Sequence, residues 1–233
     1  DAVCWPHGQP NGHHLTNRGD VPARWLIVGS RARGDICTYP DDGRHQINGE
    51  TDWRIVAADG SVLKGGPLPD ELLNLRPPWG KPYDGTPRPT VIRAGTVPAT
   101  YCAHTYPARF ADLGNAEDMA LSDAGGLTQF GAFLEILHPG GQTSLRHWHE
   151  NEDEFVMVTE GECALIDDQG EHLMRVGDCA AFPAGVRRSL GPWLGRHALG
   201  GLGMKEGAAS YAALALGSAG TGVGGIGVRD ART

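Results

Sequence analysis

Residues 141–161 read GQTSLRHWHENEDEFVMVTEG, and the interpretation of the whole chain depends on this stretch. His147 and His149 are two positions apart, so on a β-strand both imidazoles project from one face while Trp148 points the other way. Glu154 would face the wrong side of a continuous strand, so we expect the polar run before it to be a turn that returns the chain antiparallel. The carboxylate then lies beside the imidazoles. Two His and one carboxylate on a rigid sheet suit a divalent transition metal and leave coordination positions for water or substrate.

The same stretch resembles the first signature motif of the cupins, which is Gly, five residues, His-x-His, four residues, Glu, six residues, Gly. The fixed positions are filled by Gly141, His147, His149, Glu154 and Gly161. Within this resemblance, Gly161 selects Glu154 as the ligand, since neither Glu152 nor Asp153 has a Gly seven positions later. The alternative is a pair of strand histidines beside exposed acids, with no metal.

Length and composition favour an all-β protein with a small-molecule partner. The chain has 233 residues, enough for one large or two small domains. Its 35 Gly and 16 Pro imply many turns, and short apolar runs stand where a helical protein would show long periodic segments. The formal net charge of −8 argues against binding to nucleic acid or to an anionic membrane surface.

The cysteines and the hydropathy pattern bear on the compartment. The five cysteines are an odd number, are widely spaced and form no Cys-x-x-Cys pair, so neither a disulfide framework nor a zinc knuckle is indicated. No apolar run approaches the roughly 20 residues that span a bilayer, and no signal peptide opens the chain. We therefore expect a cytoplasmic protein.

An eight-residue pattern occurs twice, in residues 1–8 and 178–185: an acid, three small or apolar residues, an aromatic residue, Pro, any residue and Gly. This suggests two copies of one domain. The pattern also resembles the second cupin motif, which continues with His, three residues and Asn. In the first copy His13 and Asn17 complete that ending, although the turn is two residues longer than usual, so His14 is an alternative. After the second copy the resemblance stops.

The remaining strands follow from short apolar runs. Residues 23–29 are interpreted as a buried strand, and residues 51–56 and 61–64 as two strands joined by an Asp-Gly turn. A strand over residues 127–137 is expected to end at His138-Pro139, and residues 163–176 to form a hairpin.

Four segments are therefore expected. Residues 1–64 look like the second half of a cupin-like unit, and residues 65–90 form a Pro- and Gly-rich linker. Residues 91–190 form a cupin domain with the metal motif, and residues 191–233 a Gly- and Ala-rich, poorly ordered tail.

The resemblance implies a jelly-roll β-barrel with a metal inside its mouth, either iron, manganese, zinc or nickel. Most cupins of this kind carry three His and one Glu. Here one account is a three-ligand site of His147, His149 and Glu154, and the other is that residues 1–35 dock into the later copy and bring His13 as the fourth ligand. Paired barrels within one chain or a homodimer would cover an outer apolar face, and Phe133, Ile136, Phe155, Met157, Leu165 and Phe182 are expected to pack around the site.

The function implied is a metal-dependent enzyme acting on a small oxygenated molecule such as an organic acid, a sugar or an aromatic diol. Dioxygenase, decarboxylase, isomerase and lyase all stay open, and no catalytic residue is assigned. Arg146 and Arg188 are candidate contacts for an anionic group. The alternatives are a non-catalytic sensor cupin that holds a metal or metabolite, and a packed barrel in which the motif is a relic.

Overall fold

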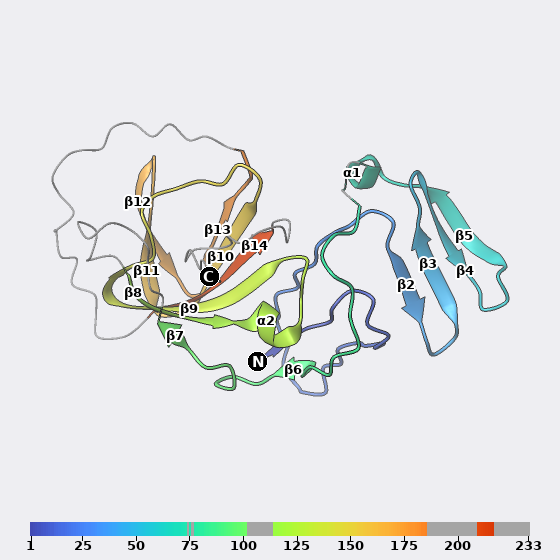
Figure 1. Ribbon diagram of the computed structural model, residues 1–233, viewed down its shortest axis with the longest axis horizontal. Helices are drawn as coiled ribbons and strands as arrows, with labels where there is room; N and C mark the ends of the chain where they lie inside the picture. Colours follow the sequence, from blue (N-terminus) through green and yellow to red (C-terminus); the bar gives the residue numbers. More distant parts are fainter. Residues whose placement is uncertain (74, 76, 102–113, 186–208, 217–233) are drawn as a thin grey trace. The chain divides into compact units, whose positions relative to one another are not determined.

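The structure is a computed structural model, and it describes residues 1–73, 75, 77–101, 114–185 and 209–216. The chain divides into two compact units, each described by itself: Asp1–His7 with Tyr83–Thr233, and Gly8–Pro82. Almost all of the regular structure is β-strand, which confirms the all-β expectation (Figure 1). Among the described residues, no helix is long and apolar enough to cross a membrane.

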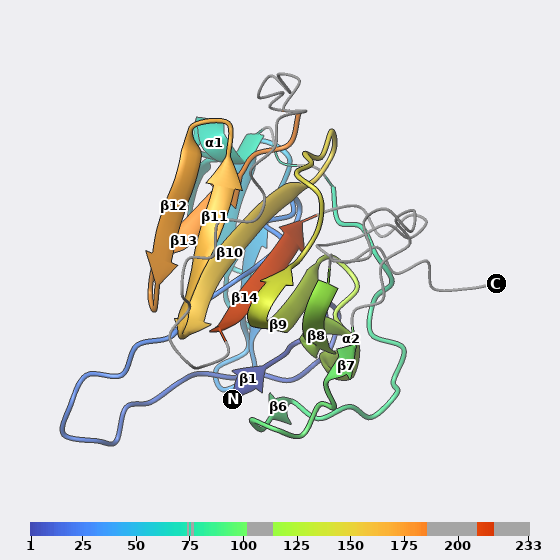
Figure 2. The ribbon, with the colours of Figure 1, turned by 90° about the vertical axis from the view of Figure 1, so that its left-hand side faces the viewer.

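The first unit is built on a six-stranded sheet in the order β13-β10-β14-β9-β8-β7. Figure 2 shows β14 between β10 and β9, although β14 is the last of these strands in the sequence. The strands are β7 (Thr100–Tyr101), β8 (Gly114–Ala120), β9 (Gly131–Gln142), β10 (Asp153–Glu160), β13 (Cys179–Phe182) and β14 (Ala209–Leu216).

The position of β14 decides how β9 is connected to β10. Both strands pair antiparallel with β14, so they run in the same direction and do not pair with each other. Ala215 on β14 is the register partner of both Glu154, near the start of β10, and Gly131, at the start of β9. Both strands therefore start at the same end of the sheet, and the chain must return along the sheet from the end of β9 to the start of β10. The expected antiparallel return is therefore wrong. Residues 143–152 form an irregular crossover connection, and the expected strand over His147 and His149 is replaced by this connection.

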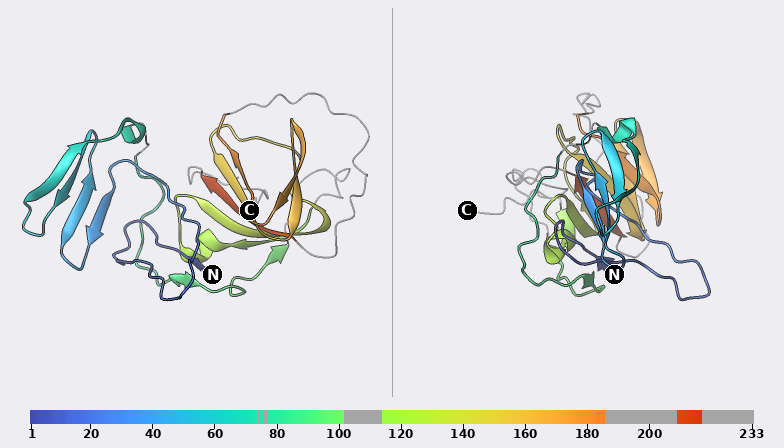
Figure 3. Two further views of the ribbon diagram at one scale, coloured as in Figure 1. Left: turned by 180° about the vertical axis from the view of Figure 1, so that it is seen from behind. Right: turned by 90° about the vertical axis from the view of Figure 1, so that its right-hand side faces the viewer.

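Shorter elements complete the unit. The hairpin of β11 (Glu162–Asp167) and β12 (Gly170–Arg175) confirms the hairpin expected from the sequence. In Figures 1 and 3 it stands across from β13, β10 and β14. Helix α2 (Leu121–Gly125) joins β8 to β9. Near the N-terminus, β1 (Ala2–Val3) pairs with β6 (Val91–Ile92).

The buried residues of the large sheet lie on the face that carries Glu154. Register partners project to the same side of an antiparallel sheet. Pairing through β14 links Val158 to Glu135, and Glu135 is in turn the partner of Asp118 on β8. These three side chains are 1 %, 2 % and 9 % exposed. The inward face therefore combines an apolar lining with acidic groups.

Strand β9 continues through Pro139, although we expected it to stop there. Proline can lie in a sheet where a bulge removes the need for its missing N–H. Opposite Pro139 the register with β8 shifts between Gly114 and Ala116, and the Asn115 amide donates a 3.2 Å hydrogen bond to the Pro139 carbonyl. The bulge therefore accommodates Pro139 and lets β9 reach the start of the crossover connection.

The second unit is a four-stranded antiparallel meander in the order β2-β3-β4-β5. Its elements are β2 (Ile36–Tyr39), β3 (Arg44–Asn48), β4 (Asp52–Val56), β5 (Val62–Pro67) and α1 (Asp70–Leu73). The hairpin of β4 and β5 confirms the expected Asp-Gly turn, in which Gly60 has φ 87°.

Three expectations differ from the structure. Residues 23–28 form no strand, and Trp25 and Ile27 are 56 % and 77 % exposed, because no described strand edge pairs with this segment. Within the range expected to be a tail, residues 209–216 form a central strand of the sheet, while the rest of residues 186–233 lies outside the described residues. The side chains expected to pack around the site are half-buried: Phe133, Ile136, Phe155, Met157, Leu165 and Phe182.

The repeated eight-residue pattern has the same local conformation in both copies. Each begins with a short strand, continues into a turn after Pro, and ends in a Gly with positive φ. The φ values are 79° at Gly8 and 72° at Gly185, a region that favours glycine. The pattern thus specifies a strand followed by a turn in both places.

We predict that Ala213→Pro destabilises the protein, because it removes a backbone donor from a strand with neighbours on both sides. Ala213 is paired with Val156 and with Phe133. The free energy of unfolding should fall by about 1–3 kcal/mol, measured by chemical denaturation. Ala23→Pro is the control, since residue 23 is exposed and outside any strand. Equal stability of the two variants would contradict the central position of β14.

Candidate metal centre

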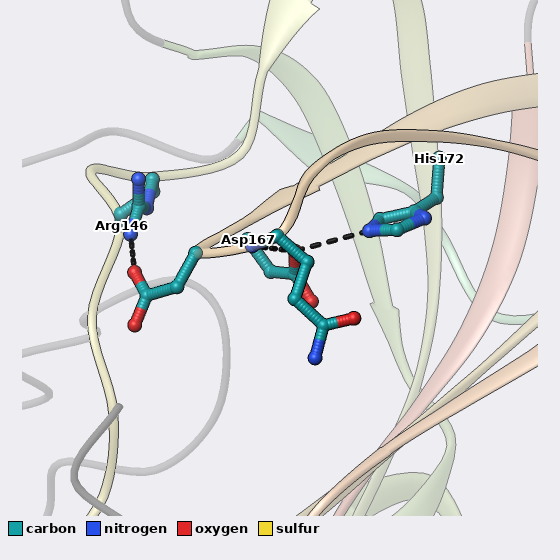
Figure 4. A network of polar contacts seen from close by, with 5 residues as sticks. Arg146, Asp167 and His172 are labelled. Atoms are coloured by element: carbon teal, nitrogen blue, oxygen red, sulfur yellow. Dashed lines mark hydrogen bonds and ion pairs between the residues drawn. The ribbon is translucent and has the colours of Figure 1, made fainter. Parts of the chain in front are cut away.

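The crossover connection is tied to the rest of the unit at both ends. Early in it, the Arg146 guanidinium contacts the Asp168 carboxylate at the tip of the β11–β12 hairpin (Figure 4). Later in it, the Gly185 N–H donates a 2.9 Å hydrogen bond to the His149 carbonyl. The connection therefore runs from the hairpin tip to the turn that follows β13, and it carries His147 between these two anchors.

The hairpin tip is itself ordered by polar contacts (Figure 4). The Asp167 carboxylate accepts a 2.7 Å hydrogen bond from the Gln169 N–H and lies 3.0 Å from His172 Nε2. Since Arg146 is engaged with Asp168, its charge is directed to this tip and not to the site. Arg188, the other candidate anion contact, lies outside the described residues.

The structure brings His147, His149 and Glu154 together. One ligand atom from each lies within 4.8 Å of the others. Two ligands at about 2.2 Å from one ion are at most about 4.4 Å apart, so a small side-chain rotation would bring the three atoms onto a shared ion. The two imidazole centroids are 5.0 Å apart, and the rings are inclined at 83°. The convergence does not depend on a strand conformation, because the crossover presents both imidazoles from irregular backbone.

Hydrogen bonds decide which nitrogen of His147 is free. His147 Nδ1 lies 2.9 Å from the Leu145 carbonyl oxygen and 3.2 Å from Ser144 Oγ. A carbonyl only accepts, so Nδ1 carries the proton and Nε2 keeps its lone pair for a metal. In His149 the Nε2 atom is buried and has no hydrogen-bond partner. Both imidazoles thus have an Nε2 atom that can act as a ligand.

Glu154 is the buried acid of the group. Its side chain is 9 % exposed, and its Oε1 atom has no hydrogen-bond partner. Burial raises the pKa of this carboxyl above its ordinary value, the neighbouring His149 and His147 lower it, and Glu152 raises it further. An unpartnered buried carboxylate is costly, and a cation would offset that cost.

The four acids before and at the start of β10 have different positions. Glu154 faces the imidazoles, whereas Asp153 accepts a 2.7 Å hydrogen bond from the Ala184 N–H in the turn after β13. Glu150 is exposed. Glu152 lies beside His149, with its Oε2 atom 3.9 Å from Nδ1. The sequence predicts no role for Glu152, since the motif spacing distinguishes only the ligand.

Two further acids on the inward face were not singled out from the sequence. Glu135 and Asp118 are register partners on β9 and β8, and both are buried. Glu135 could have been found from the sequence, because it is an acid within the apolar run of β9 and a carboxyl group is rarely buried without a partner. Both residues have partners in the structure.

His13 belongs to the unit Gly8–Pro82, which is described by itself. It is exposed, and its Nδ1 atom is 2.9 Å from the Asn11 carbonyl oxygen. The Asn17 amide donates a 2.9 Å hydrogen bond to the Val21 carbonyl, and its Oδ1 atom accepts one from Gly19, so it shapes a local turn. The role of His13 as a fourth ligand stays a prediction.

Comparison with known proteins supports the family assignment. A family model described as a cupin domain matches residues 133–191, which include the whole crossover connection. A structure from Silicibacter pomeroyi DSS-3, described as a sugar phosphate isomerase from a cupin superfamily, is 38 % identical over 54 % of this chain and 74 % of its own, with a TM-score of 0.43. The chain belongs to the cupin superfamily. The resemblance seen in the motif spacing of this cupin is thereby confirmed.

Other similar structures are more distant from this cupin. A putative sugar phosphate isomerase from Acidithiobacillus ferrooxidans is 22 % identical, with 43 % of this chain and 56 % of its own covered and a TM-score of 0.30. An iron(II) form of HppE is 13 % identical over 62 % of this chain and 67 % of its own, with a TM-score of 0.32. No curated protein matches the chain.

We predict that Glu154→Gln stabilises the metal-free protein at pH 7. A carboxyl whose folded-state pKa is raised stabilises the fold while protonated, and this contribution is lost as pH rises through the raised pKa. Glutamine is neutral at every pH, so Tm should rise by about 2–4 °C, the shift that about 1 kcal/mol produces in a chain of this length. The difference in Tm between the variant and the wild type should shrink as the pH falls below 4.5, the ordinary pKa of a glutamate carboxyl.

Glu150→Gln is the matched control, since it removes the same charge from an exposed position of the same connection. A decrease of Tm for Glu154→Gln at pH 7, measured by thermal unfolding in the presence of a chelator, would contradict the prediction.

Proposed function

We propose that this cupin binds a divalent transition metal through His147, His149 and Glu154 and acts as a metal-dependent enzyme on a small oxygenated molecule. The observation that carries the proposal is the convergence of the three side chains within 4.8 Å, together with the buried, unpartnered His149 Nε2 and Glu154 Oε1 atoms. Polar atoms are rarely buried without a partner unless a functional group or an ion uses them.

The donor set fits such a metal. Two imidazoles and one carboxylate resemble the facial triad of non-haem iron sites, which leaves positions open for exogenous ligands. A metal bound there supplies Lewis acidity toward substrate oxygens or a site for dioxygen. The protein contributes the rest: the Leu145 carbonyl holds the tautomer of His147, and the anchored connection holds both imidazoles beside β10.

The substrate panel follows from the expected classes, which are organic acids, sugars and aromatic diols. The relative from Silicibacter pomeroyi is described as a sugar phosphate isomerase, so sugar isomerisation belongs in the first round of assays. Oxygen uptake with the same panel tests the dioxygenase class. Turnover supports an enzyme, whereas stoichiometric metal without turnover over the whole panel supports a sensor cupin. A homodimer and a cytoplasmic location stay predictions.

We predict that His147→Ala, His149→Ala and Glu154→Ala each weaken metal binding by more than about 100-fold, because each removes a ligand and not merely a residue that hydrogen-bonds to a ligand. Calorimetric titration of the metal-stripped full chain and elemental analysis measure the effect. His172→Ala is the matched control, since His172 is paired with Asp167 at the hairpin and is no member of the converging group. A ligand variant that binds like the wild type would remove that residue from the site.

We predict that metal affinity falls as the pH drops below about 6, because protons compete with the metal for the imidazoles. Because the pKa of Glu154 is raised, protons also compete with the metal for this carboxylate at a higher pH than they would for an exposed carboxyl. Titrations between pH 5 and 8 measure the dependence. An affinity that stays constant over this range would rule out imidazole ligands.

A further inference from the structure

Glu152 is a half-buried acid that the proposed ligand set does not use. Its Oε2 atom is buried and has no hydrogen-bond partner, although the side chain as a whole is 21 % exposed. The neighbouring acids have other positions, since Asp153 accepts the Ala184 N–H and Glu150 is exposed. A carboxylate oxygen left without a partner inside a protein calls for an explanation.

This oxygen lies beside the imidazole of His149. Glu152 Oε2 lies 3.9 Å from His149 Nδ1, while His149 Nε2 is buried and unpartnered. The two ring nitrogens point in different directions. His149 therefore faces Glu152 through Nδ1, and its buried Nε2 is the nitrogen left for the group of ligand atoms that includes Glu154.

The two imidazoles differ in what lies behind them. Nδ1 of His147 is held by neutral oxygens, the Leu145 carbonyl and the Ser144 hydroxyl. Nδ1 of His149 faces a carboxylate. A carboxylate behind a ligating imidazole fixes its orientation and tautomer and makes it a stronger donor to the metal. A separation of 3.9 Å is an ion-pair distance and longer than a hydrogen bond, so a small rotation of the ring is needed to close the contact.

We infer that Glu152 is a positioning residue that accepts the Nδ1–H of His149 and directs Nε2 of that ring to the metal. The inference rests on the proposed metal site. It also implies a charge balance, because two carboxylates, Glu152 and Glu154, neutralise a divalent ion. Asp153 cannot take this role while it holds the turn after β13 through Ala184.

The test compares Glu152→Gln and Glu152→Ala with the matched control Glu150→Gln, using the metal-stripped full chain and Co²⁺ as the probe. Calorimetry should show affinity reduced about 10-fold in Glu152→Gln and up to about 100-fold in Glu152→Ala. Glu150→Gln should stay within about 2-fold of the wild type, since an exposed charge is screened by solvent.

Proton NMR of the Co²⁺ form gives a readout that a purely structural role would not move. Each ligand imidazole with a protected Nδ1–H gives an exchangeable, paramagnetically shifted signal. The wild type should show one signal for His147 and one for His149, and Glu152→Ala should lose only the second. The Tm of each metal-free variant checks the fold, and Glu152→Gln keeps the test available if the Ala variant is unstable.

Three outcomes would overturn the inference. Unchanged Co²⁺ affinity with both signals present in Glu152→Ala would show that His149 needs no carboxylate. Equal weakening by Glu150→Gln would show a general charge effect. A wild-type chain that binds no Co²⁺, Mn²⁺, Fe²⁺, Ni²⁺ or Zn²⁺ would overturn the proposed metal function itself, and this result differs from metal binding that is insensitive to residue 152.

Discussion

The hydrogen bond from the Gly185 N–H to the His149 carbonyl is the contact on which the site depends. Residues 143–152 cross between two strands that do not pair, so the backbone of this segment has no sheet ladder to hold it. The turn after β13 replaces that ladder, through Gly185 on the backbone and through Ala184 on the Asp153 side chain. Since Gly185 has φ 72°, a glycine suits this position.

The site also concentrates polar atoms that the fold alone does not satisfy. His149 Nε2, Glu152 Oε2 and Glu154 Oε1 are buried without hydrogen bonds. Each weakens the metal-free protein, because a buried polar atom loses its contacts with water. A bound cation would compensate for this loss, so stability and metal binding are linked through the same atoms. The pKa of Glu154 shows both effects, since burial disfavours the charged carboxylate and the neighbouring imidazoles favour it.

The sequence was sufficient for the members of the candidate site but not for the path of the chain around it. The spacing of His147, His149 and Glu154 predicted their convergence, because a motif of residue types follows from what one ion requires. It did not predict the crossover, since that depends on β14, a segment rich in Ala and weak in strand propensity. The strand predicted over the apolar run around Trp25 is absent for the opposite reason, because strand propensity alone does not supply a partner edge.

The place of β14 has a consequence for the order of events during synthesis. Strands β9 and β10 are joined through residues 209–216, so the sheet cannot close until a segment far along the chain has left the ribosome. Pairings between such distant segments slow folding, because the loop must be closed before the contacts form. Until then β9 and β10 expose unpaired edges, and these nascent edges are where association with other chains would begin.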